Sequence, residues 1–288
     1  MLSDEGIDAL CASSAPKLEQ LKATIAALPS AVVAFSGGVD SAFVLKVAVD
    51  VLGERALAVT AISASVAPDE AQAAKTIAAE LGARHLLVDS QELADPRYAA
   101  NPTNRCYFCK TELYTRCEAI RAEQGLAAVL DGFNADDKKD HRPGHQAARE
   151  HAVRSPLAEA GLTKDEIRAW SKRLGLSTWD KPQLACLASR LPYGTPVTSE
   201  RLTQIGRAEA AVKALGLRIF RVRHHGDVAR LELGAEELQR ALDPALRARL
   251  DQALKACGYR FVAVDLEPFR SGRLNDALTQ GFSLPVVA

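Results

Sequence analysis

Residues 31–41 read Ala-Val-Val-Ala-Phe-Ser-Gly-Gly-Val-Asp-Ser, an apolar run followed at once by a turn with two glycines and the start of a helical pattern. Gly37 and Gly38 permit positive φ and a close approach of the backbone to a ligand. Ser41 begins a helix whose free N–H groups and dipole favour an anion. The stretch therefore predicts a strand, a pyrophosphate-binding turn and a helix; the alternative is a plain strand-to-helix turn with incidental glycines.

The same alternation of apolar runs and helical patterns fills the first half of the chain. Strands are expected at Ala31–Phe35, Ala56–Ile62, Arg84–Asp89 and Ala128–Asp131, and helices around Ser41–Leu52, Pro68–Leu81 and Cys109–Gln124. Such a succession indicates an α/β fold, a parallel Rossmann-like sheet with helices on both faces. Ligands of such sheets bind beyond the carboxyl ends of the strands. A capping box, Thr163-Lys-Asp-Glu166, starts the helix that closes this domain near Gly175.

The second half begins with a stretch without periodicity, from Ser177 to Thr198, whose prolines and aromatic residues indicate an ordered loop. A smaller α+β domain is expected after it. Its elements are a helix at Ser199–Leu215, two strands at Arg218–His224 and Val228–Leu233 that pair as a hairpin, a helical stretch at Ala235–Ala256 and a strand at Tyr259–Leu266. The predicted division is residues 1–176, an active-site loop at 177–198 and a C-terminal domain at 199–288.

Composition narrows the class of protein. The 288 residues are 48% hydrophobic and 25% charged, as in globular domains. Lys and Arg balance Asp and Glu at 36 each, which gives no electrostatic case for a nucleic acid or a membrane surface as partner. The acidic start of the chain lacks the pattern of a signal peptide, and no apolar run approaches the roughly 18 residues of a spanning helix. We therefore expect a cytoplasmic protein.

Two common phosphate-binding motifs are missing: the chain has neither G-x-x-x-x-G-K-[ST] nor G-x-G-x-x-G. The hexapeptide instead resembles the signature of the PP-loop ATP pyrophosphatases, which release pyrophosphate and leave AMP on an acceptor oxygen. The resemblance implies ATP as cofactor. It also implies that the nucleotide is bound by Ser36, Gly37, Gly38, Val39, Asp40 and Ser41.

Further stretches are similar to one family of that superfamily. They are Asn101–Lys110, Asp131–Asp137, Cys186–Gly194 and Asp265–Arg270. All four resemble the LarE family, the ATP-dependent sulfur transferases of nickel-pincer nucleotide cofactor biosynthesis. The resemblance implies that the carboxylates of pyridinium-3,5-biscarboxylic acid mononucleotide are adenylated and then converted to thiocarboxylates. It also implies sulfide or another sulfur source and assembly into a homo-oligomer.

Six cysteines are too few for a secreted disulfide framework, so closely spaced ones suggest metal binding or catalysis. By the resemblance, Cys106, Cys109 and Cys186 hold a [4Fe-4S] cluster. Three thiolates leave one iron open for an exogenous hydrosulfide. Zinc is the competing occupant of such a site, and a second alternative is a metal-free protein in which Cys186 sacrifices its own sulfur. The other cysteines, Cys11, Cys117 and Cys257, lie in helical patterns and are expected to be buried and unreactive.

Polar residues in the same motifs are candidates for ATP and Mg²⁺. Asp40 and Asp137 are expected to position Mg²⁺ on the phosphates, because this cation prefers carboxylate oxygens and bridges phosphate groups. Asn134 belongs to the same motif as Asp137 and is expected at the nucleotide. Ser63, just after the second strand, lies where the resemblance to the PP-loop superfamily implies the adenine pocket.

Arginines complete the predicted site. Arg105 and Arg190 flank the cysteines and are expected to stabilise the phosphorus transition state or the substrate carboxylate. Arg221 and Arg223 alternate along one strand and so share a face. With Arg270 they are expected to bind the phosphate of the mononucleotide, the alternative for each arginine being a solvated surface charge. The predicted catalytic set is Cys186, Asp40, Arg105 and Arg190.

Two other classes of function stay open: the same ATP chemistry directed at another acceptor, in a tRNA thiolase or an amide-forming synthetase, and nucleotide binding without turnover. A PP-loop tRNA thiolase should carry a basic surface, which the zero net charge does not suggest; an amide-forming synthetase needs an ammonia source. A nucleotide-binding metal sensor without turnover would hold ATP and never convert it to AMP and pyrophosphate.

Overall fold

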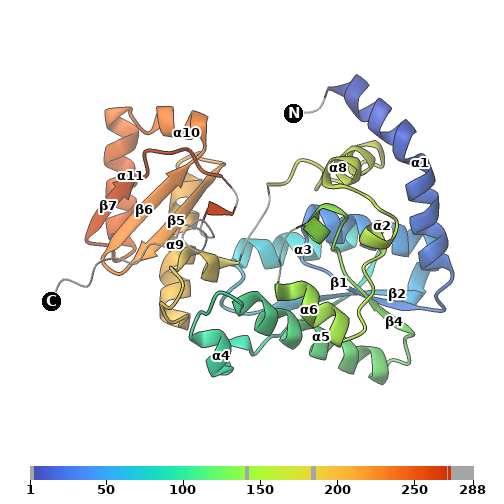
Figure 1. Cartoon of the computed structure of the whole chain (residues 1–288). Coiled ribbons are helices and arrows are strands. Elements are labelled where there is room, and N and C mark those ends of the chain that lie inside the picture. Colours follow the sequence, from blue (N-terminus) through green and yellow to red (C-terminus); the bar gives the residue numbers. More distant parts are fainter. Residues whose placement is uncertain (1–2, 140–142, 183–185, 271, 274–288) are drawn as a thin grey trace. The chain divides into compact units, whose positions relative to one another are not determined.

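The computed structural model describes residues 3–139, 143–182, 186–270 and 272–273 (Figure 1). The chain forms two compact units, an N-terminal unit at Met1–Leu184 and a C-terminal unit at Ala185–Ala288. The active-site loop expected at 177–198 therefore contributes residues to both units. Within the described residues no helix is long and apolar enough to cross a membrane.

The N-terminal unit is built on a four-stranded parallel sheet with the strand order β3-β2-β1-β4. Its strands are β1 (Ala31–Ala34), β2 (Ala56–Ile62), β3 (Arg84–Asp89) and β4 (Ala128–Leu130). All four residues of β1 are buried, as expected of a central strand covered on both faces. The predicted parallel sheet is confirmed, with each strand within a residue of its expected limits.

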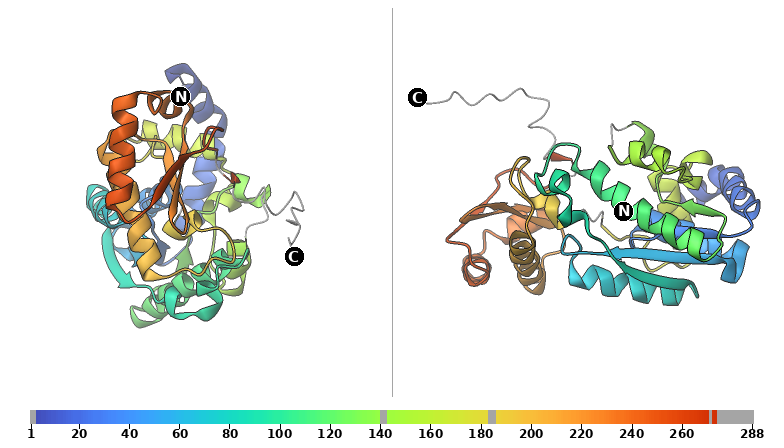
Figure 2. Two further views of the ribbon diagram at one scale, coloured as in Figure 1. Left: turned by 90° about the vertical axis from the view of Figure 1, so that its left-hand side faces the viewer. Right: turned by 90° about the horizontal axis from the view of Figure 1, so that it is seen from below.

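Helices cover both faces of this sheet. One layer contains α1 (Asp4–Ala26), α2 (Val39–Leu52), α3 (Pro68–Glu80), α7 (Pro156–Glu159) and α8 (Lys164–Arg173). The opposite layer contains α5 (Arg105–Glu123) and α6 (Pro143–Glu150), and a short helix, α4 (Pro96–Ala99), precedes α5. Val33 faces the first layer and Val32 the second, because successive side chains of a strand point to opposite faces. Figure 2 shows α3 and α5 on opposite sides of the sheet.

Helix α1 was not predicted. It is N-capped by Ser3, whose hydroxyl accepts from the N–H of Gly6 at 3.2 Å. It buries five apolar residues at helical spacing, Ile7, Cys11, Leu18, Leu21 and Ile25. The predicted capping box of α8 is confirmed by its two reciprocal bonds, and Lys17 bonds Glu166 at 2.7 Å. Thus α1 packs beside α8 and enlarges the first layer.

The C-terminal unit has a three-stranded sheet in the order β5-β6-β7. Its strands are β5 (Phe220–His225), β6 (Val228–Leu233) and β7 (Phe261–Val264), and its helices are α9 (Ser199–Ala214), α10 (Ala235–Arg240) and α11 (Pro244–Ala256). The predicted hairpin of β5 and β6 is confirmed, and β7 pairs with β6 in parallel. The helical stretch expected at 235–256 consists of two helices, because Asp243 caps α11 and Pro244 occupies its first turn, so a new helix starts there.

Short 3₁₀ helices lie in the connections of both units. They are η1 (Gly53–Arg55), η2 (Glu92–Ala94), η3 (Asp136–Lys139) and η4 (Leu187–Arg190). Three of them carry or contact candidate residues: η2 contains Glu92, which accepts from Ser63, η3 contains Asp137, and η4 directly follows Cys186. The irregular connections of the fold thus hold a large part of the predicted site.

Candidate active site

The glycine loop, residues Ser36–Ser41, joins β1 to α2 at the carboxyl edge of the sheet. The Ser41 hydroxyl accepts from the N–H of Ser36 at 3.2 Å and donates to the carbonyl of Gly38 at 3.2 Å. The Ser36 and Ser41 hydroxyl oxygens lie 3.1 Å apart. Gly38 is the N-cap of α2 and provides no side-chain cap. The first N–H groups of α2 therefore stay available to an anion.

Two glycines make this loop possible. Gly37 has a φ of +69°, and a Cβ there would lie 3.3 Å from Ala74 of α3. Gly132, in the turn after β4, approaches α2 so closely that a Cβ would lie 2.9 Å from the backbone nitrogen of Ser41. The turn after β4 thus packs against the start of α2, where only glycine fits.

Asn134 links the two predicted magnesium ligands. Its side-chain amide donates to Asp40 Oδ1 at 3.4 Å, and its backbone N–H donates to Asp137 Oδ2 at 3.1 Å. The structure therefore brings Asp40, Asn134 and Asp137 together, although more than ninety residues separate the first two. Two carboxylates beside an anion-binding loop fit Mg²⁺, which is usually held by one or two carboxylates together with substrate phosphates.

Two lysines at the glycine loop were missed by the sequence reasoning. Lys164 Nζ donates to Asp40 Oδ2. Lys181 Nζ donates to the carbonyl of Gly37 at 3.1 Å and to Glu70 Oε2 at 2.8 Å. Neither lysine stands in a motif that signals phosphate binding: Lys164 lies within the capping box of α8, and Lys181 precedes a proline. Only the tertiary structure shows where they lie.

Ser63 lies just after β2, the strand next to β1. Its hydroxyl donates to Glu92 Oε1 and accepts from the N–H of Ser65 at 3.1 Å. Glu92 is only 3% exposed, and its Oε2 has no hydrogen-bond partner within the part of the chain that the structure describes. Ser63 therefore lies in a buried polar cluster after the second strand, where an adenine pocket was expected.

Arg105 and the C-x-x-C pair open α5. Arg105 is 4% exposed and donates to the side-chain carbonyl of Asn101, itself buried with a φ of +55°. Cys106 is exposed and Cys109 half-buried, and residues three apart lie on the same side of a helix. Cys117, further along α5, is fully buried, and burial raises the pKa of its thiol to about 12. Only the first two thiols of α5 are therefore accessible.

The remaining cysteines also differ in how far they are buried. Cys11 is buried, which raises the pKa of its thiol, whereas Cys257 is half-buried; the expected burial is therefore confirmed for Cys11 and Cys117 and wrong for Cys257. Cys186 is half-buried and belongs to the C-terminal unit, whereas Cys106 and Cys109 belong to the N-terminal one. Among the described residues, no three His, Cys, Asp or Glu side chains gather into a metal-binding group.

Two arginines hold the turn that carries Cys186. Arg190, 3% exposed, donates through Nη1 to the carbonyl of Cys186 at 3.2 Å and to the hydroxyl of Ser189 at 2.9 Å. Its Nε and Nη2 bind both oxygens of Glu209, each at 2.8 Å. Arg223 donates to the carbonyl of Ser189 at 2.6 Å. The turn is thereby fixed to α9 and to β5.

One face of the small sheet is polar. This polar sheet face consists of Arg221, Arg223, Arg230, Glu232 and Asp265. Glu232, 1% exposed, accepts from Arg223 at 2.6 Å and from Arg230 at 3.1 Å. Asp265 accepts from Arg230 as well. Buried carboxylates thus offset much of the positive charge on this face.

Arg221 lies over the ring of Phe269, 4.7 Å from its centroid. Burial, reinforced by the charges of Arg190 and Arg223, lowers the pKa of Arg221 to about 10. Arg270 is exposed. For Arg190 and Arg223 the alternative of a solvated surface charge is wrong, because both side chains are buried.

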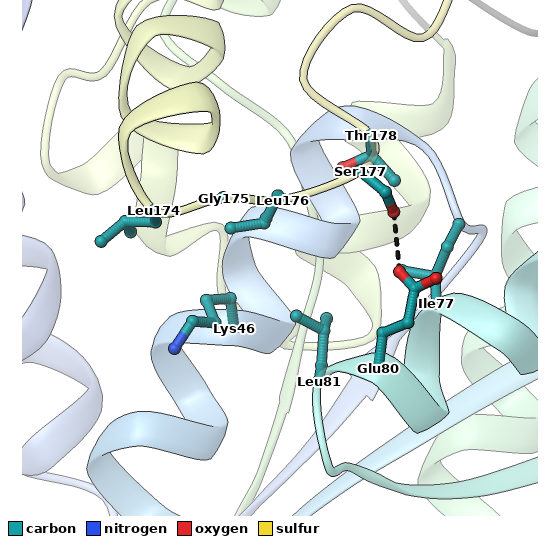
Figure 3. Close-up of a pocket in the computed structure, with 9 residues that line it drawn as sticks. All are labelled: Lys46, Ile77, Glu80, Leu81, Leu174, Gly175, Leu176, Ser177 and Thr178. Atoms are coloured by element: carbon teal, nitrogen blue, oxygen red, sulfur yellow. Dashed lines mark hydrogen bonds between the residues drawn. The ribbon is translucent and has the colours of Figure 1, made fainter.

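A separate cavity of about 160 Å³ lies between α2, α3 and the segment after α8 (Figure 3). Ser177 closes one side of it by donating to Glu80 at 2.7 Å. Lys46 lies on another side and is paired with Asp50. The described lining of this cavity contains none of the candidate residues, so the cavity is distinct from the glycine loop.

Known proteins resemble this chain over most of its length. A family model described as NAD synthase, from the PP-loop superfamily, matches residues 16–116. An uncharacterised protein of Synechocystis is 46% identical over 264 residues, which are 92% of this chain and 98% of the relative. A pyridinium-3,5-bisthiocarboxylic acid mononucleotide synthase of Lactiplantibacillus plantarum is 40% identical over 270 residues, 93% of this chain and 97% of the relative. Because this identity extends over nearly the whole of both chains, the protein belongs to the LarE family of the PP-loop superfamily.

Proposed function

We propose that the protein is an ATP-dependent sulfur transferase. It adenylates the carboxylates of pyridinium-3,5-biscarboxylic acid mononucleotide and converts them to thiocarboxylates, as in nickel-pincer nucleotide cofactor biosynthesis. The observation that carries the proposal is the near full-length similarity to a synthase of the bisthiocarboxylic product. The glycine loop, with Asp40 and Asp137 beside it, supports the ATP-dependent half of the reaction.

In the first half-reaction, a substrate carboxylate oxygen attacks the α-phosphorus of ATP. The bond between the α-phosphorus and the bridging oxygen breaks, pyrophosphate leaves, and AMP stays on the carboxylate. The glycine loop and the N-terminus of α2 bind the departing phosphates through backbone N–H groups. Mg²⁺, held by Asp40 and Asp137, would supply positive charge to them. Arg105 would stabilise the charge that develops around the α-phosphorus.

In the second half-reaction, sulfur replaces AMP at the acyl carbon. The resemblance to the family favours a [4Fe-4S] cluster, which Cys106, Cys109 and Cys186 would hold and which would supply a place for external sulfide. The accessibility of Cys106 and Cys109, in contrast to Cys117, is compatible with that role. In the competing mechanism the thiolate of Cys186 attacks the acyl carbon and AMP leaves; loss of the Cα proton then cleaves the Cβ–S bond, which leaves dehydroalanine.

Arg221, Arg223 and Arg270 would bind the phosphate of the substrate. Arg221 supports this assignment best, because burial and two neighbouring cations lower its pKa to about 10. A dianion beside it would relieve that repulsion. Arg190 would bind the substrate carboxylate at the Cys186 turn, which it already holds.

The decisive experiment is anaerobic purification with analysis of iron, sulfide and protein mass during turnover. We expect a brown protein that turns over repeatedly when supplied with sulfide and keeps the mass of Cys186. Changing Cys106, Cys109 or Cys186 to Ala should remove iron and turnover together, because each change leaves too few thiolates. Cys257→Ala is the matched control and should change neither.

Other outcomes select other functions. A colourless active protein that becomes lighter by one H₂S per chain, with Cys106→Ala still competent, would replace the cluster by a sacrificial Cys186. ATP that is bound but never cleaved to AMP and pyrophosphate would indicate a nucleotide-binding sensor. Pyrophosphate release that depends on tRNA or on ammonia would indicate the thiolase or the amide synthetase.

A further inference from the structure

The segment after α8 is held in place through its backbone carbonyls. Arg168 of α8 donates to the carbonyl of Trp179 at 2.6 Å and to the carbonyl of Lys181 at 2.8 Å. Lys172, also on α8, lies 4.8 Å from the centroid of the Trp179 ring. These contacts fix the main chain just before Lys181 and at Lys181 itself, independently of its side chain.

The side chain of Lys181 reaches the glycine loop itself. Its ammonium donates to the carbonyl of Gly37 at 3.1 Å and to Glu70 Oε2 at 2.8 Å. Gly37 is the residue whose φ of +69° turns the loop, and it contacts α3, the helix that carries Glu70. The positive charge therefore lies beside the backbone groups that would receive phosphate oxygens.

This ion pair lies largely inside the protein. The Lys181 side chain is 18% exposed and that of Glu70 21%. An ammonium has three N–H donors, and the contacts with Gly37 and Glu70 use two of them within the described part of the chain. One donor is thus left for an acceptor that enters the loop.

We infer that Lys181 is a further ATP-binding residue, which binds the β- or γ-phosphate and stays with the leaving pyrophosphate. The inference rests on the proposed ATP cleavage. Negative charge grows on pyrophosphate as the bond to the α-phosphorus breaks, and a preorganised cation stabilises it. Glu70 is the ion-pair partner of Lys181 in the structure. The Glu70 carboxylate lies beside the proposed triphosphate site, so it competes with the phosphates for the ammonium of Lys181.

The two members of the pair should therefore affect triphosphate binding in opposite directions. Removing the charge of Lys181 removes an attraction for phosphate. Removing the charge of Glu70 removes a competitor and a repulsion. A pair that only stabilises the fold would give the same direction for both changes, a loss of stability with no change in nucleotide affinity.

The test is calorimetric binding of two probes, α,β-methylene-ATP with Mg²⁺ and AMP, to the full-length protein. Lys181→Ala should weaken binding of the triphosphate analogue roughly ten- to a hundredfold, the range of a lost hydrogen bond to a charged group, and leave AMP binding unchanged. Lys181→Arg should restore most of the affinity. Glu70→Gln should tighten binding of the analogue about two- to fivefold.

Lys46→Ala is the matched control, since Lys46 forms an ion pair with Asp50 on α2 outside the glycine loop. It should bind both probes as the wild type does. Unchanged affinity of Lys181→Ala for the analogue, or equal weakening for AMP, would overturn the inference. The probe is not cleaved, so this result stands apart from the proposed function, which fails if the wild type never releases pyrophosphate from ATP.

Discussion

The two units carry their proposed anion-binding groups in different forms. In the N-terminal unit, the glycine loop presents backbone N–H groups at the start of α2, and its geometry depends on the contiguous residues Ser36–Ser41. In the C-terminal unit, positive charge comes from arginine side chains on the polar sheet face and from Arg190. Backbone dipoles need no counter-charge, whereas crowded guanidinium groups repel one another and require buried carboxylates between them.

Those carboxylates also hold the C-terminal unit together. Glu209 binds Arg190 through both oxygens and accepts from the N–H of Val222 at 3.0 Å, which joins α9 to β5. Glu232 is shared by Arg223 and Arg230. The arginines are therefore part of the fold as well as of the proposed site, so changing one of them affects stability and binding together. In the glycine loop these two effects should separate.

The largest effect should follow from Asp40→Ala. Its carboxylate is a proposed ligand of Mg²⁺ on the phosphates, so pyrophosphate release should fall at least about a hundredfold. The free energy of unfolding should fall far less than in the removal of a fully buried ion pair, because the Asp40 side chain is 23% exposed and loses its bonds to Asn134 and Lys164. A pyrophosphate-release assay and thermal unfolding measure the two quantities.

Asp50→Ala is the control for Asp40→Ala, being an exposed carboxylate on the same helix, paired with Lys46. It should retain full activity. If Asp40→Ala kept its activity, or released ADP in place of AMP and pyrophosphate, the assignment of the glycine loop to adenylation would be wrong. If Asp40→Ala lost activity because the protein unfolded, binding and stability would be coupled in the glycine loop as they are on the polar sheet face.

The second effect should be a loss of stability in Arg223→Ala. Arg223 and Glu232 are 8% and 1% exposed at the side chain, and removing one member of a buried pair costs about 3–5 kcal/mol. We expect the lower end of that range, because Arg230 still bonds Glu232. Denaturant unfolding of the variant measures the loss.

Two comparisons sharpen that result. Arg260→Ala removes an exposed pair with Asp227 in the same unit, 3.3 Å long, and should cost less than about 1 kcal/mol. A combined Arg223→Met and Glu232→Leu change should cost less than Arg223→Ala alone, since no buried charge is left without its partner. An equal loss for Arg223→Ala and Arg260→Ala would mean that the polar sheet face is not held by its ion pairs.

The same contrast explains how far the sequence could predict the molecule. The strands and the capping box were predicted because short apolar runs and a four-residue motif are local signals. The break before α11 was missed although Asp243-Pro244 is itself a local start signal. The contact of Lys181 with Gly37, or of Arg190 with Glu209, had no signal at all, since each joins residues that only the tertiary fold brings together. Helix α1 was not predicted, and its sequence carries a contrary local signal, because Pro16 lies inside the helix and proline usually interrupts one.

A smaller effect is expected for substrate binding. Arg270→Ala should weaken binding of the mononucleotide by roughly 1.5–3 kcal/mol, the value of a hydrogen bond to a charged group, with ATP binding untouched. Because Arg270 is exposed, its stability should stay close to that of the wild type. Arg221→Ala should weaken substrate binding as well, and titration calorimetry with substrate compares the two.

If Arg221→Ala, Arg223→Ala and Arg270→Ala all bound the substrate with unchanged affinity, the arginines would serve the fold alone. If only Arg221→Ala and Arg223→Ala lost affinity for the substrate, in proportion to their loss of stability, the same conclusion would follow. Only Arg270→Ala separates binding from folding, since its side chain is exposed.

The smallest effect concerns pH and the opposite face of the same sheet. His224 of β5 is buried, with its Nδ1 3.2 Å from the hydroxyl of Tyr259. Burial, helped by the charges of Arg201 and His225, lowers the pKa of its imidazole. In the unfolded chain an imidazole takes up its proton near pH 6.5. Below that pH the unfolded state binds more protons than the folded state, so the free energy of unfolding should fall as pH falls.

In His224→Phe the dependence on pH should become shallower, measured by denaturant unfolding from about pH 8 to about pH 5.5. At the upper limit the His224 imidazole is neutral in the folded and in the unfolded protein. The difference in free energy of unfolding between variant and wild type at that pH therefore measures the change in packing alone. Part of the slope should persist, because the pKa values of His85 and His225 are also lowered by burial. Parallel curves for variant and wild type over this range would mean that His224 is charged as readily in the fold as outside it. The buried side of the small sheet would then tolerate a cation without a carboxylate, contrary to what the ion pairs of its polar sheet face imply.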